Sequence, residues 1–173
     1  MIDFDAASLL LQWATGGLLF LWVTTRRREV GLGYGWLMRG VYLAMAAGAW
    51  YVGTQVIEPL PVRDAASAGV VLASGAALAV SIVRRKAGVS GQVALAEKRT
   101  ARVAAMTGID RQAAERDLDA KEFPPALDLI APLIGVIGII DAAVNAGGPA
   151  WLAIARFLVG AAFMGAITAL EHR

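Results

Sequence analysis

The chain has 173 residues, of which 58% are hydrophobic and 17% are charged, and its formal net charge is +2. This balance is too apolar for a soluble globular domain of that length. The absence of cysteine excludes a disulfide scaffold and a cysteine-based zinc or iron–sulfur site. Composition therefore predicts an integral membrane protein, and it indicates no particular activity.

Three apolar blocks in the first half of the chain are each long enough, at about 1.5 Å per residue, to cross a hydrocarbon core of about 30 Å as a helix. The first covers residues 6–25, with Asp5 in front of it and arginines behind it. This is the reverse of a secretory signal, so we expect a retained helix. The second covers residues 36–57 and ends before Pro59, and the third covers residues 65–83 and ends at a basic cluster.

A polar segment, residues 87–125, follows the third block. Its basic first part and acidic second part predict two short helices, one over about residues 91–106 that ends at Gly108 and one capped by Asp110. The first is weakly amphipathic and suits anionic lipid headgroups or a partner's cytoplasmic face. The plainer interpretation is a solvated connector whose charges follow the positive-inside rule.

The last two apolar blocks cover residues 126–144 and 150–170, and glycines and a proline between them predict a tight turn. The whole pattern predicts one all-α membrane domain, a bundle of five transmembrane helices with a helical connector between the third and the fourth.

Lysine and arginine in the loops predict the orientation, because cytoplasmic loops retain positive charge. The loop after the first block and the long polar segment are rich in both, whereas the other two loops hold only Arg63. With five spans, both basic loops lie on one side, so we expect an outside N-terminus and a cytoplasmic C-terminus. The 35 alanines, and 13 arginines against three lysines, favour a multi-pass protein of a bacterial plasma membrane.

Small residues recur at every fourth position in the second and third blocks, and again in the fifth at Ala161, Gly165 and Ala169. Lipid is as apolar as leucine, so membrane helices associate through close packing at small side chains. We therefore expect the third block to be the central span and the bulky, leucine-rich first block to lie at the periphery or at an oligomer contact. Chance recurrence in an alanine-rich chain is the alternative. The residues are Ala65, Gly69, Ala73, Ala77 and Ser81 in the third block, and Gly40, Ala44 and Gly48 in the second.

Asp141 and Arg156 are the two charges predicted to lie deepest in the membrane. An ionisable residue at that depth costs about 2.5–3.5 kcal/mol on insertion scales. Both residues are equally far along the chain from the turn between the last two blocks, so both lie about 11 Å from it. They predict either a structural ion pair that locks the last two helices or part of an ion or proton relay.

Arg39 and Asp128 are expected near the cytoplasmic interface. The simpler interpretation is a pair of solvated interfacial charges, because an arginine can extend its stem toward the headgroups. A bridge between the second and fourth spans is the alternative. Gln12 lies within the apolar first block and is expected to hydrogen-bond to a neighbouring helix.

Signals of enzyme chemistry are weak. The one histidine, His172, lies at the C-terminal end, and no His-Glu-x-x-His, Walker or Gly-x-Ser-x-Gly motif occurs. No catalytic residue, cofactor, metal or nucleic acid is therefore predicted. The partners expected are the lipid bilayer and a larger membrane complex or further copies of the chain. We expect an accessory, assembly or scaffold protein that acts by helix packing, with a small oligomeric transporter or channel as the alternative.

Overall fold

The computed structural model describes residues 5–26, 31–87, 90–108 and 122–170. Within these ranges the chain is helical and contains no strand. The helices are α1 (Ala6–Thr25), α2 (Leu32–Gln55), α3 (Pro61–Val83), α4 (Ser90–Thr107), α5 (Ile130–Asn145) and α6 (Ala150–Leu170), with two short 3-10 helices, η1 (Arg84–Ala87) and η2 (Pro125–Leu129).

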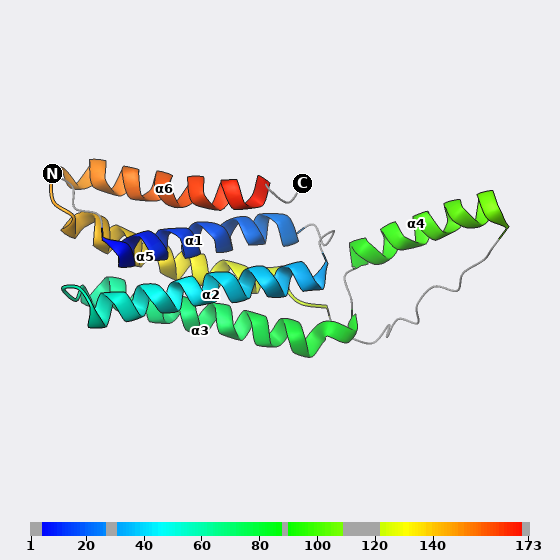
Figure 1. The fold of residues 1–173 in the computed structure, drawn as a ribbon, viewed down its shortest axis with the longest axis horizontal. Helices are drawn as coiled ribbons and strands as arrows, with labels where there is room; N and C mark the ends of the chain where they lie inside the picture. The colour runs from blue at the N-terminus through cyan, green and yellow to red at the C-terminus, as the bar shows by residue number, and fades with distance from the viewer. Residues whose placement is uncertain (1–4, 27–30, 88–89, 109–121, 171–173) are drawn as a thin grey trace.

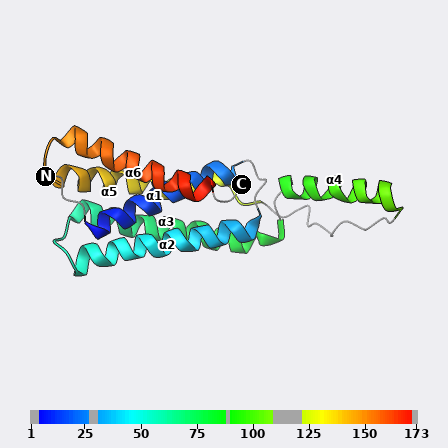
Figure 2. The ribbon, with the colours of Figure 1, turned by 45° about the horizontal axis from the view of Figure 1, so that its top comes forward.

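The helices α1, α2, α3, α5 and α6 lie side by side as a bundle, and α4 extends away from one end of it (Figures 1 and 2). We call this end the α4 end and the opposite one the Asp5 end. Among the described residues, four stretches are long and apolar enough to cross a membrane. They are Ala6–Thr25, Pro61–Val83, Pro125–Asn145 and Ala150–Thr168. The chain is therefore a helical membrane protein.

Local chemistry explains where the first and third helices begin. The Asp5 carboxylate accepts a hydrogen bond from the Ser8 backbone N–H at 2.7 Å and so caps the first turn of α1. Pro61 opens α3, because the first turn of a helix needs no N–H at that position. The predicted block starts four residues later, so the earlier start brings Arg63 and Asp64 into the helix.

Glycine ends two of the described helices. Gly147 and Gly148 have φ angles of 82° and 74°, which lets α5 reverse into α6 as the sequence predicts. Gly108, with φ 69°, follows α4, which lies close to the predicted residues 91–106. The second helix predicted for the connector, from Asp110, lies outside the described residues.

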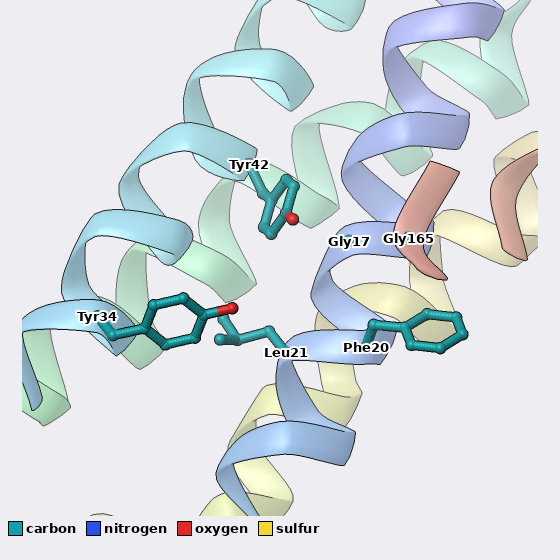
Figure 3. Close-up of a pocket in the computed structure, with 6 residues that line it drawn as sticks. All are labelled: Gly17, Phe20, Leu21, Tyr34, Tyr42 and Gly165. Carbon is teal, nitrogen blue, oxygen red and sulfur yellow. The ribbon is translucent and has the colours of Figure 1, made fainter. Parts of the chain in front are cut away.

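α1 is the central helix of the bundle, so the predictions that it lies at the periphery or at an oligomer contact and that the third block is the central span were wrong. It packs against α2, α5 and α6, whereas α3 packs mainly against α2 and α5. Two glycines make this possible, because a Cβ at Gly16 would collide with the Ala161 carbonyl and one at Gly17 with the Tyr42 ring. Figure 3 shows Tyr42 reaching from α2 toward α1 at Gly17, in a crevice with no room for a water molecule.

The small residues predicted to line helix interfaces are placed unevenly. In α3, Ala77 and Ser81 are buried and Gly69 lies against Ile134, but Ala65 is exposed and Ala73 is only half-buried. The buried face of this helix includes Ser67, Val70, Ser74, Ala77 and Ser81.

The stripe predicted in α2 is not the buried face of that helix. Gly40 and Gly48 are half-buried, and Ala44 is exposed. The helix is turned so that Arg39 and Tyr42 point into the bundle, and of the stripe only Gly48 stays close to α1, where a Cβ would lie 3.3 Å from Leu10. The residues buried instead are Gly35, Met38, Arg39, Tyr42, Ala46, Ala49 and Gly53.

The close approach at Gly16 gives a first prediction. Gly16→Ala will lower the free energy of unfolding by about 1–3 kcal/mol, because the backbone of α6 must move away from the new methyl group. Gly40→Ala is the matched control, since nothing lies within 4 Å of a Cβ there. The control will leave stability unchanged or raise it by up to about 1 kcal/mol through helix propensity. Unfolding by denaturing detergent, followed by tryptophan fluorescence, measures both; equal effects would contradict the packing.

Candidate functional site

A buried ion pair joins α2 to η2 at the α4 end of the bundle. Arg39 Nε donates to Asp128 Oδ1 at 2.8 Å, and Arg39 Nη2 donates to Asp128 Oδ2 at 2.6 Å. Only 4% of the arginine side chain and 1% of the aspartate side chain are exposed. Charge-assisted bonds of this two-point kind are among the strong hydrogen bonds in proteins. We call this pair and its neighbours the Arg39 cluster.

Neighbouring polar groups extend the Arg39 cluster to α1 and α3. Thr25 Oγ1 donates to Asp128 Oδ2 at 3.3 Å. Ser81 Oγ accepts from Trp36 Nε1 at 3.0 Å and from Arg39 Nη1 at 3.4 Å. The guanidinium also lies 4.4 Å from the centre of the Phe123 ring.

The Arg39 cluster overturns the interpretation of Arg39 and Asp128 as solvated interfacial charges. Both residues are buried. The alternative prediction, a bridge between the second and fourth predicted blocks, agrees with the ion pair in the structure. The position of a residue in the sequence predicts its depth in the membrane but not the direction of its side chain, so the sequence alone left the two possibilities open.

A second buried arginine, Arg63, lies at the Asp5 end with three carboxylates around it. Its Nε donates to Asp64 Oδ1 at 2.8 Å, and its Nη1 donates to Asp5 Oδ2 at 3.1 Å. Its backbone N–H donates to Asp141 Oδ2 at 3.0 Å. The Arg63 cluster thus connects the start of α1, the start of α3 and the end of α5. Gly53 of α2 leaves room for it, because a Cβ there would collide with Asp64.

Sequence reasoning missed the Arg63 cluster. Arg63 was counted only as a loop charge, and 1% of its side chain is exposed. Pro61 is the signal that points to it, because a proline at the first helical position places the next residues in the first turn. Three side-chain atoms of the described residues are buried without a hydrogen-bond partner: Arg63 Nη2, Gln12 Nε2 and Thr15 Oγ1.

The structure does not bring Asp141 and Arg156 together. Asp141 is half-buried; besides Arg63 N–H, it accepts a hydrogen bond from Asn145 Nδ2 at 3.3 Å. Arg156 is exposed on α6. Over the ranges that the structure describes, no hydrogen bond or ion pair joins the two residues, and neither arginine cluster includes a residue of α6.

A cavity of about 210 Å³ lies between α1, α5 and α6. Its walls are apolar apart from Thr15, and it borders Leu133, Leu158 and Ala162. None of the four charged residues predicted as candidates lines it.

The chemistry of these sites is that of charge-assisted hydrogen bonding between helices. No group of three or more histidine, cysteine, aspartate or glutamate residues in the described part of the chain can hold a metal ion. Comparisons with protein-family models, curated proteins and solved structures gave no match.

Proposed function

We propose that this chain is an assembly or scaffold component of a membrane complex that acts by helix packing. In this proposal α1, α2, α3, α5 and α6 cross the membrane, five spans in all, with the N-terminus outside and the C-terminus in the cytoplasm. Supporting this orientation, α4 and the basic residues of η1 lie at one end of the bundle, and cytoplasmic loops retain positive charge. We propose a bacterial plasma membrane as the location.

The outer face of α6 carries the proposal. Figures 1 and 2 place α6 at the edge of the bundle, where it packs against α1 and α5. Large apolar side chains are exposed on its other side, and Arg156 is exposed among them. They are Trp151 at 74%, Val159 at 67%, Phe163 at 64% and Ile167 at 43%. A guanidinium that faces lipid at the centre of a span costs about 2.5–3.5 kcal/mol on insertion scales, and a carboxylate on a partner helix offsets part of such a cost.

Site-specific photocrosslinking in the native membrane tests the proposal. A photoreactive amino acid at Val159 of α6 will give a protein adduct that mass spectrometry identifies, because a partner helix covers this face. The same group at Leu72 of α3, which is 73% exposed, is the matched control and will react with lipid. Arg156→Leu will reduce the Val159 adduct. Lipid adducts alone at both positions would overturn the proposal.

A further inference from the structure

The free faces of α5 and α6 form one continuous surface. The two helices are antiparallel neighbours joined by a four-residue turn, residues 146–149. On α5 the exposed large apolar side chains are Ile130, Leu133, Ile137, Ile140 and Val144, and α6 adds the exposed residues named above. Apolar area alone does not associate helices in lipid, so the charges at its margins decide what this surface binds.

The two charges lie on opposite margins of this surface. Leu158 and Ala162 of α6 line the cavity shared with α5. Arg156 is two residues before Leu158, about 200° around the helix, and so lies on the margin away from α5. Asp141 is bonded to the backbone of α3 and so lies on the margin of α5 away from α6.

We propose that a second copy of this chain covers this surface, with Arg156 of each copy paired to Asp141 of the other. The inference deepens the proposed function and rests on it. In a two-fold pair stacked face to face, each α6 lies opposite the partner's α5. The margin of α6 away from its own α5 then meets the margin of the partner's α5 away from its α6. These are the margins that hold the arginine and the aspartate, so the contact forms twice.

The depths of the two residues fit this symmetry. Rotation about an axis along the membrane normal leaves depth unchanged, so residues that pair across it must lie at matching levels. Asp141 lies four residues before the end of α5, and Arg156 lies six after the start of α6, about 6 Å and 9 Å into the bundle. The arginine side chain leans toward the start of its helix, which closes the difference of about 3 Å.

The aspartate retains the capacity to accept the arginine. A carboxylate has about four lone-pair sites. The described contacts give each oxygen of Asp141 one donor, Arg63 N–H on Oδ2 and the Asn145 amide on Oδ1. Because Asp141 is half-buried, a guanidinium can reach it from outside the bundle. The pair that the sequence predicts within one chain thus forms between copies.

Paired single-cysteine variants test the geometry, because the chain has no cysteine of its own. Differently tagged copies, one with Ile137→Cys and one with Val159→Cys, will crosslink in native membranes, since these positions are exposed at similar depth on facing helices. Leu72→Cys paired with Val159→Cys is the control and will not crosslink.

A second experiment tests whether Arg156 contributes to dimer formation. Copies labelled with a donor or an acceptor dye are placed in lipid vesicles, and energy transfer between them is measured as lipid is added. Arg156→Leu will weaken the dimer by at least about tenfold, Arg156→Lys by less, and Ala44→Leu on the exposed side of α2, outside this surface, will leave it unchanged. A monomeric parent chain, or equal loss in the two leucine variants, would overturn the dimer. If Val159 then still crosslinks to a different, identified protein, the proposed function stands without the dimer. If the photoreactive group at Val159 gives only lipid adducts, both the dimer and the proposed function are wrong.

Discussion

Replacing Asp128 by alanine will lower the free energy of unfolding by about 3–5 kcal/mol, because a buried charge loses its partner. The Arg39 guanidinium makes two bonds of 2.8 Å and 2.6 Å to this carboxylate, and its side chain is 4% exposed. Ser81 and Phe123 remain near it, but neither carries a negative charge. Detergent-induced unfolding in bicelles, followed by tryptophan fluorescence, measures the loss.

A double replacement separates the loss of a partner from the loss of the pair. Arg39→Met together with Asp128→Leu removes both charges and keeps apolar volume in their place. Such replacements of buried ion pairs are often neutral or stabilising, so the double variant will recover most of the stability that Asp128→Ala loses. A double variant as unstable as the single one would show that the pair is not the source of the effect.

The two arginine clusters share α1 and α3, and together they join every helix of the bundle except α6. The Arg39 cluster joins α1, α2, α3 and η2, and the Arg63 cluster joins α1, α3 and α5. α6 belongs to neither and packs by close approach to α1, where Gly16 and Gly165 remove side-chain volume. Arg156 of α6 therefore lies outside both clusters and is exposed.

Hydropathy predicted the helices well, because it depends only on how many apolar residues follow one another. The predicted blocks 6–25 and 150–170 coincide with α1 and α6, and the bounds of the other bundle helices differ from the predicted blocks by four residues at the start and by at most two at the end. The difference matters at α3, where four added residues convert Arg63 from a loop charge into the centre of a buried cluster. Pro61 at the first position of α3 is the local signal that indicates this earlier start.

Rotation of each helix about its own axis was much harder to predict. Repeats of small residues marked Gly40, Ala44 and Gly48 as a contact face, but the structure turns Arg39 inward beside them. The partner of Arg39 lies 89 positions away in the chain, and nothing local to either residue identifies the other. Likewise, the leucines of α1 suggested a lipid-facing helix, although Leu11 and Leu18 are buried at its centre.

Arg63→Met will destabilise the bundle by about 3–5 kcal/mol, because Asp64, with 7% of its side chain exposed, loses its cation. Arg63→Lys will recover only part of this loss, since one ammonium cannot reproduce the separate bonds from Nε to Asp64 and from Nη1 to Asp5. The same unfolding measurement checks both variants. Arg26→Met is the matched control: Arg26 is exposed at the end of α1, and its replacement will change stability by less than about 1 kcal/mol. Equal losses at the two arginines would show that burial of Arg63 among carboxylates does not hold this end of the bundle.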